Sequence, residues 1–490
     1  MLGLVRSVKN SFAPVNRIPS DVFSLIPGHW GEDDGDQNLI TLTHVCRGWR
    51  ELLIARSSLW ACLDCMNFDK TRVYIERSKS SPLELSLYKR GASTYLEDAF
   101  HLVIPQINRL RSLRIIGRRE ILTNITPHIS NPIPHLRELT VDLTSTPASV
   151  LEGTLPSGDL PSLCSLTLAG VVTNLPWKNL SKLTTFKLSC VPEGKISITQ
   201  LLNFFMNARQ LTDIDLHRSI PPSSDAPPGR VVSLPCLKNF TIHTKRPHSI
   251  LLNHLRIPIE ASLVLEYDFD GDRSPLPEFL PKDLGNLGNV LSIESVNLRF
   301  DKVEKSVRLD GRNGQLYMFG HRKDPTRASS ALDSRIIRSL GCFTLCGTRR
   351  LAISLYGSPK VAEVGGSAPY HILSKMRDLR TLLLSQSNNL PFIFALNPDQ
   401  NSSKVILCPK LGELVLYVEG LEGFYITELM CMVEERASRG AKLSLVTIVG
   451  LGDLMPKGDV FKLKRHVTRV NYKIGENPPK WDSISGHEDD

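Results

Sequence analysis

Two cysteines three positions apart, Cys62 and Cys65, have the spacing that zinc sites and redox-active disulfides use. A structural zinc site needs four ligands, and no second pair with finger-like spacing follows in this sequence. Cys342 and Cys346 lie far along the chain, with no histidine pair beside them. We therefore expect these cysteines to be buried thiols, and we predict no metal and no other cofactor.

An acidic run at Asp268–Asp272 resembles the start of a calcium-binding loop. An EF-hand loop requires glycine at its sixth position and glutamate at its twelfth. In this run the glycine comes too early, and the twelfth position is Phe279. The run is therefore predicted to be a turn.

Catalytic motifs are missing from the sequence. It has no Gly-x-Ser-x-Gly elbow, no His-Glu-x-x-His helix and no Walker phosphate loop, and its 13 histidines are dispersed. We predict a non-enzymatic chain that acts by binding.

The composition is that of a globular protein, with 41% hydrophobic and 22% charged residues among 490. It excludes global disorder, a collagen, a coiled-coil rod and a disulfide-stapled miniprotein. The N-terminus shows no apolar signal region, no stretch reaches the 18 apolar residues of a membrane span, and the cysteines are scattered singly. These features predict a cytoplasmic and/or nuclear protein with no membrane contact.

The elements that would position a binding site begin at residue 18. Pro19 suits the first position of a helix, and Val22 and Ile26 give the following turn one apolar face. A polar, glycine-rich loop with four acidic residues is expected from Pro27 to Asn38.

A second helical run follows this loop, and Gly48 weakens it, so that it is either one helix or two short ones. Helices this short need packing against something else, because a unit of about 50 residues has little core of its own. The run's apolar residues recur at spacings of three and four: Leu39, Leu42, Val45, Trp49 and Leu52.

The rest of the chain, to residue 472, repeats a unit of apolar, two variable, apolar, one variable, apolar residues. The first six units are separated by 26, 27, 20, 28 and 26 residues, and three later units lie 32 apart. Units near 260 and 351 are degraded, and residues 300–345 are the least regular. The units begin at Leu110, Leu136, Leu163, Leu183, Leu211, Leu237, Ile293, Leu379, Leu411 and Leu443, with a weaker one at Val467.

This spacing predicts an α/β solenoid of irregular leucine-rich repeats. Each unit would form a short strand with one buried face, and 15–20 residues would return the chain through a helix or an arc, as at Tyr95–Ile104 and Ile198–Met206. Stacked units would form a parallel sheet on the concave side. Unrelated α/β domains are the alternative, because short apolar runs are ambiguous.

The order of residues between 18 and 60 resembles an F-box, as found in the F-box proteins that are abundant in mushroom-forming fungi. An Ile-Pro start, an apolar helix, a Val-Cys-Arg-Gly-Trp helix and a terminal Leu-Trp occur in that order. Two features depart from the usual pattern: Ile18 replaces leucine, and the acidic loop Pro27–Asn38 lengthens the gap between the first two helices.

The resemblance implies the substrate receptor of a Skp–cullin–F-box ubiquitin ligase. The F-box would dock on a Skp-family adaptor and through it on a cullin, and the repeats would hold an unknown target protein. The residues expected at or under the adaptor contact are Ile18, Pro19, Val22, Val45, Cys46, Trp49 and Trp60.

The expected domain organisation has five parts. They are an N-terminal tail (1–17), the F-box (18–66), a linker helix and connection (67–82), the repeats (83–472) and a polar C-terminal tail (473–490).

Charge is divided unequally between these parts. Residues 18–66 carry a net charge of −4, so the remainder carries +13 of the chain's total of +9. A basic repeat surface could face an acidic target. By strand alternation, Arg114, Lys187, His217 and His243 would point outward and form a tentative target-binding site.

Two other functions remain open. The helical unit could be a cap that packs on a leucine-rich interaction scaffold and recruits no adaptor. Nucleic-acid binding is disfavoured, because the chain lacks a stacking motif and an arginine-rich tract.

Overall fold

The computed structural model divides the chain into two compact units, Met1–Pro192 and Glu193–Asp490. Each unit is described by itself. The structure describes residues 12, 14, 18, 19, 22, 35–88, 95–117, 121, 133–144, 151–152, 160–172, 180–191, 195–221, 224–245, 249–269, 280–281, 283–301, 306–311, 316–322, 347–356, 367–385, 390–401, 404–418, 423–450 and 457–474.

The first unit contains a sheet in which each described strand runs parallel to its neighbour. The leucine-like residues of the repeat face one side of this sheet; Leu113, Leu139 and Leu166 are among the fully buried ones. In spatial order the strands are β1 (Cys62–Leu63), β2 (Leu83–Tyr88), β3 (Leu110–Ile116), β4 (Glu138–Asp142), β6 (Ser165–Ala169) and β8 (Thr185–Ser189). A separate parallel pair joins β5 (Leu151–Glu152) to β7 (Val171–Val172).

The helix that follows the predicted acidic loop begins within the segment predicted to form that loop. The expected loop end at Asn38 is wrong, because α3 (Gly35–Thr43) already starts at Gly35. The helical conformation is interrupted at residues 44–46, so the second apolar run forms two short helices. The elements that follow α3 are α4 (Arg47–Ala55), η3 (Ser57–Trp60), α5 (Phe68–Ser78), α6 (Tyr95–Val103) and η4 (Ile104–Arg109).

The second unit continues the same repeat in a longer sheet. Most neighbouring strands are parallel, and even the degraded units contribute strands at Leu263 and Leu351. The spatial order is β9 (Asp213–His217), β11 (Asn239–Thr244), β13 (Ser262–Phe269), β16 (Leu316–Arg322), β15 (Ser306–Gly311), β14 (Ser295–Asp301), β17 (Arg350–Tyr356), β18 (Thr381–Ser385), β19 (Glu413–Val418), β20 (Leu445–Gly450) and β21 (Arg469–Ile474).

The least regular region of the sequence breaks the expected parallel order. After β14 the chain turns back as β15, antiparallel to β14, and then forward as β16, which pairs in parallel with β13. Two strands therefore stand between β13 and β14, which are consecutive in the repeat pattern. The prediction of a purely parallel sheet is wrong here, because a hairpin has been inserted into it.

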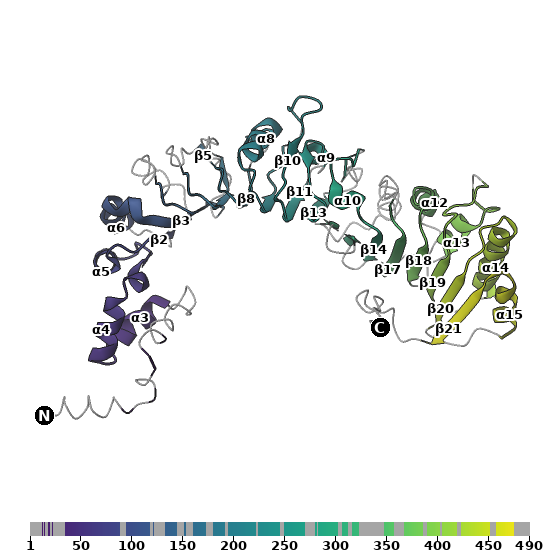
Figure 1. Ribbon diagram of the computed structural model, residues 1–490, viewed down its shortest axis with the longest axis horizontal. Helices are drawn as coiled ribbons and strands as arrows, with labels where there is room; N and C mark the ends of the chain where they lie inside the picture. The colour runs from purple at the N-terminus through teal and green to yellow at the C-terminus, as the bar shows by residue number, and fades with distance from the viewer. Residues whose placement is uncertain are drawn as a thin grey trace. The chain divides into compact units, whose positions relative to one another are not determined.

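Helices alternate with strands in the last part of the second unit, from β17 to β21. In Figure 1, α12, α13, α14 and α15 succeed one another along one side of the strands β18 to β21, and neighbouring helices in this series are in contact. The series is α8 (Ile198–Asn207), α9 (Ser249–Leu252), α10 (Gly288–Leu291), α12 (Ser367–Ser374), α13 (Leu390–Leu396), α14 (Gly423–Ser438) and α15 (Lys457–His466); β10 (Val232–Ser233) and β12 (Leu255–Arg256) form a separate parallel pair.

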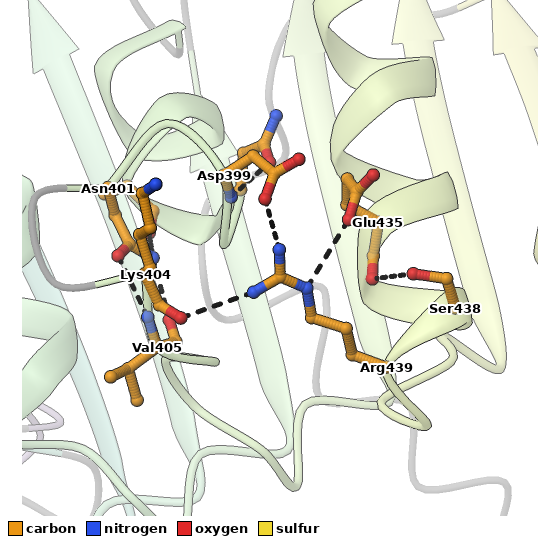
Figure 2. A network of polar contacts seen from close by, with 9 residues as sticks. Asp399, Asn401, Lys404, Val405, Glu435, Ser438 and Arg439 are labelled. Carbon is orange, nitrogen blue, oxygen red and sulfur yellow. Dashed lines mark hydrogen bonds and ion pairs between the residues drawn. The ribbon is translucent and has the colours of Figure 1, made fainter.

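Two arginines, one on α14 and one directly after it, hold the loop that precedes β19. Arg436 is fully buried and donates to the carbonyl oxygens of Leu407 (2.8 Å) and Cys408 (3.0 Å). Arg439 pairs with Asp399 and Glu435 and donates to the Lys404 carbonyl, as Figure 2 shows. Since buried backbone carbonyls need donors, these side chains replace a regular hydrogen-bond ladder in the loop.

The architecture is therefore mixed α/β with large parallel sheets, as predicted. The return helices expected at Tyr95–Ile104 and Ile198–Met206 are present as α6 and α8, and β21 ends at Ile474, two residues past the boundary expected at 472. None of the helices within the described ranges has the length and apolar composition needed to cross a membrane.

Candidate protein-interaction site

The junction of α3 and α4 is held by an arginine. Arg50 of α4 donates from Nε to the carbonyl oxygen of Thr43 at the end of α3, at 2.8 Å. The Thr43 hydroxyl in turn donates to the carbonyl of Ile40 (2.7 Å). Because the last carbonyls of a helix lack partners within it, Arg50 both satisfies the end of α3 and fixes the turn between the helices.

Apolar side chains project from this junction. Val45, in the turn, is 52% exposed, and Ile40 on α3 is 38% exposed. Trp49 on α4 is half-buried. Cys46 is half-buried as well and caps α4, its Sγ accepting from the Trp49 amide at 3.5 Å. Two exposed aliphatic residues beside a partly exposed tryptophan are the composition of a protein-binding surface.

Trp60 lies beneath this surface and is fully buried. Its indole Nε1 donates to the Leu53 carbonyl of α4 at 2.9 Å, and its ring meets Tyr74 of α5 edge-on, with centroids 5.0 Å apart. The Arg77 guanidinium stands 4.3 Å from the centroid of the same indole ring. Trp60 therefore belongs to the core that joins α4 to α5, under the surface rather than at it.

The first predicted helix is described at three positions. Ile18 is half-buried, Pro19 is exposed, and Val22 is 48% exposed. Residues 27–34 of the acidic loop lie outside the described residues.

A second arginine, Arg109, forms a clamp that links the end of α5 and the turn before β2 to the start of β3. Arg109 donates to the carbonyl of Ser81 through Nε (3.1 Å) and Nη2 (2.8 Å), and to the hydroxyl of Ser78 at 2.9 Å. Burial lowers the pKa of the Arg109 guanidinium. β1 also pairs with β2, so the end of the predicted F-box segment is already part of the sheet.

Cys62 lies in β1 and Cys65 lies shortly after it, and the two side chains differ in their exposure. Cys62 is exposed, and its Sγ lies 3.7 Å from the Glu84 carboxylate, to which it donates. Burial raises the pKa of the Cys65 thiol to about 12, so this sulfur is held as an inert thiol. The part of the chain that the structure describes contains no group of three or more His, Cys, Asp or Glu side chains placed to hold a metal. Cys342, Cys346 and residues 270–279 of the acidic run lie outside it.

The tentative target-binding residues fall into one pair in each unit. In the first unit the registers place Arg114 of β3 and Lys187 of β8 in a single row across four neighbouring strands. We call this row, extended to β2, the central row. It consists of Ser86, Arg114, Thr140, Thr167 and Lys187.

In the second unit the structure brings the two histidines together. His217 of β9 and His243 of β11 are register partners, with ring centroids 4.3 Å apart. His243 Nδ1 lies 3.6 Å from the carboxylate of Glu266, its partner on β13. This trio is amphoteric, because the glutamate offsets any positive charge on the imidazoles.

No family model matches this chain, and no curated protein has a significantly similar sequence.

Several residues of these surfaces were not singled out in the sequence. Ile40 follows the buried Leu39 and carried no signal of its own. Thr140, Thr167 and Glu266 could have been found by applying strand alternation to every unit, since they flank the inward leucines in the same way as Arg114 does.

Proposed function

We propose that this chain is the non-catalytic substrate receptor of a Skp–cullin–F-box ubiquitin ligase, acting in the cytoplasm and/or the nucleus. Its F-box segment docks on a Skp-family adaptor, and its leucine-rich repeats hold the target protein. The ligase's conjugating enzyme, recruited through the cullin, supplies the chemistry.

The exposure of Val45 and Trp49 is the observation that carries this proposal. If the helical segment were only a packing cap, the apolar residues of its motif would be expected inside the unit, as Trp60 is. Instead Val45 and Ile40 are exposed, and Trp49 is partly so. Leaving such side chains in water is costly unless a partner covers them.

A rigid connection between adaptor and target sites also supports the receptor role. A receptor raises the effective concentration of its target near the transferred group only if the linking elements are stiff. The Trp60 packing, the Arg50 bond and the Arg109 clamp supply such stiffness between α3 and β3.

The alternative function is an interaction scaffold whose F-box-like cap recruits no adaptor. The observation that favours it is the burial of Trp60 against Leu53, Tyr74 and Arg77, which shows that the segment packs on its own chain. The two functions differ in whether Val45 and Trp49 become covered by another protein.

Co-purification with a Skp adaptor tests the proposal. The full chain is expected to capture the adaptor stoichiometrically, and the Val45→Asp, Trp49→Ala double variant is expected to capture at least tenfold less. The matched control is Phe461→Asp, which adds a carboxylate at an apolar side chain that is 62% exposed on α15. This control should retain full capture.

Folding of each variant is checked by circular dichroism and its melting temperature. A folded full chain that captures no Skp adaptor contradicts the receptor function and leaves the scaffold. Equal capture by the folded double variant would show that the adaptor binds elsewhere.

A further inference from the structure

We infer that the central row of the first unit binds an extended, acidic peptide segment whose two carboxylate side chains are four residues apart. This inference rests on the proposed function, because it names the chemistry of the target that the repeats would hold.

The register of the strands defines the row. Arg114 is aligned with Thr140, Thr140 with Thr167, and Thr167 with Lys187. All of these lie on the face opposite the inward leucines, since each stands between two buried apolar residues of its strand. Within the central row, the cationic side chains Arg114 and Lys187 are thus separated by two threonines.

The chemistry of the row favours an anionic partner. Lys187 is exposed and Arg114 is half-buried, with Nη1 donating to the Tyr88 hydroxyl at 3.4 Å. The threonine hydroxyls can donate to carbonyl or carboxylate oxygens. None of the five side chains in the row is acidic.

The acidic side chains that flank the row are turned to other partners. Glu138 accepts from the Ser112 hydroxyl at 3.5 Å. Asp142 accepts from the amide of Thr144 (3.0 Å) and from its hydroxyl (2.6 Å), which holds the carboxylate at the end of β4. The carboxylates border the row on both sides, so a bound acidic segment is restricted to the row itself.

Strand spacing sets the spacing of the acidic residues. Neighbouring strands lie about 4.8 Å apart, so three intervals separate the Arg114 and Lys187 strands by roughly 14 Å. An extended peptide advances about 3.3 Å per residue, so positions i and i+4 are roughly 13 Å apart and point to the same side. A separation of two residues is too short, and a separation of three points the second side chain away.

The second unit does not offer the same row. There a carboxylate, Glu266, stands in the row itself, 3.6 Å from His243 Nδ1, whereas the carboxylates of the first unit stand beside the central row. The inference is therefore confined to the first unit.

Binding of synthetic peptides to the full chain, measured by fluorescence anisotropy without any adaptor, tests this inference. The peptides are eleven-residue segments with two aspartates separated by two, three or four positions and no other charged side chain. The i, i+4 peptide is expected to bind about tenfold more tightly than the other two, and Arg114→Glu or Lys187→Glu should remove this preference. Lys182→Glu is the matched control, because Lys182 is exposed and precedes the strand rather than lying in the row.

A charge reversal separates recognition from a structural effect. A peptide with lysine in place of one aspartate should bind Lys187→Glu more tightly than it binds the unaltered chain. Equal affinity for all three spacings, no binding at millimolar peptide, or equal loss with Lys182→Glu would overturn the inference. Adaptor capture is measured separately, so failure here and failure of the receptor function are distinguishable.

Discussion

The same position of the repeat has different surroundings in the first unit and in two neighbouring strands of the second. In the first unit the residue between the second and third apolar positions is Thr140, Thr167 or Lys187, and it is partly or fully exposed. In β17 and β18 of the second unit the equivalent residues Ala352 and Leu383 are only 2% and 7% exposed, whereas those of β9, β11, β19 and β20 are partly exposed. The inward apolar residues on either side are buried in both units.

This difference shows that the repeat pattern determines one face of the strands only. Inward leucines recur because each strand must bury that face against the next unit. The outward position is free to vary: it is polar and at least partly exposed in β4, β6 and β8, and apolar and buried in β17 and β18.

Placing a carboxylate at the equivalent outward positions would test this contrast most strongly. Leu383→Asp is expected to destabilise the protein by at least about 3 kcal/mol, because an unpaired carboxylate would replace a buried apolar side chain. Thr167→Asp should cost no more than about 1 kcal/mol, since its side chain is half-exposed. Urea denaturation measures both effects, and similar values for the two variants would mean that the outward faces do not differ.

Alkaline pH is expected to destabilise both units. Burial raises the thiol pKa to about 12 at Cys65 in the first unit and at Cys408 in the second. Between the ordinary value near 9 and about 12, the unfolded chain has lost these protons while the folded chain keeps them. The contribution of these thiols to the free energy of unfolding should therefore be fully present below pH 9. Above pH 9 the free energy of unfolding should fall by about 1.4 kcal/mol per pH unit and per thiol.

Urea denaturation between pH 8 and 10.5 measures this slope. The Cys65→Ala, Cys408→Ala variant is the control, because its slope should be shallower even though its stability at pH 8 is also changed. A slope that is the same in the control would show that other groups cause the alkaline loss.

Helix caps should give the smallest effect, confined to the unit that contains the cap. Asn67 accepts from the Lys70 amide (3.0 Å) at the start of α5, and Ser197 forms a capping box with Gln200 at the start of α8. Asn67→Ala and Ser197→Ala should each cost about 1 kcal/mol. Hydrogen exchange should accelerate in α5 for the first variant and in α8 for the second, whereas Asn67→Asp and Ser197→Thr should change little. Faster exchange in the unit whose cap was left intact would contradict this assignment.

The regular parts of the fold were predictable because their signals are local. Each Leu-x-x-Leu-x-Leu unit gave a strand, and so did the weak unit at Val467, which contributes to β21. The alternative of two short helices is confirmed, but Gly48 is not the cause: it lies within α4, and the interruption is at residues 44–46. These features depend on residues within a few positions of one another.

The features that the sequence did not reveal depend on distant residues. Trp60 is buried by Tyr74 and Arg77, which lie outside the F-box-like motif. Leu383 had the same local pattern as Thr167, and its burial does not follow from that pattern. The β15–β16 hairpin is inserted between β13 and β14, and the sequences of these two strands do not indicate an insertion.

The hairpin between β13 and β14 has a consequence for synthesis of the chain. Elsewhere in the second unit each new strand pairs with the one made just before it, so the sheet can grow as the chain leaves the ribosome. At β13 this growth must stop, because its next neighbour, β16, ends only at Arg322. Until then β13 has an open edge, and the meander of β14, β15 and β16 must form before it closes. Cotranslational folding of the second unit is therefore expected to pause at this seam, where an exposed strand edge would most need protection by chaperones.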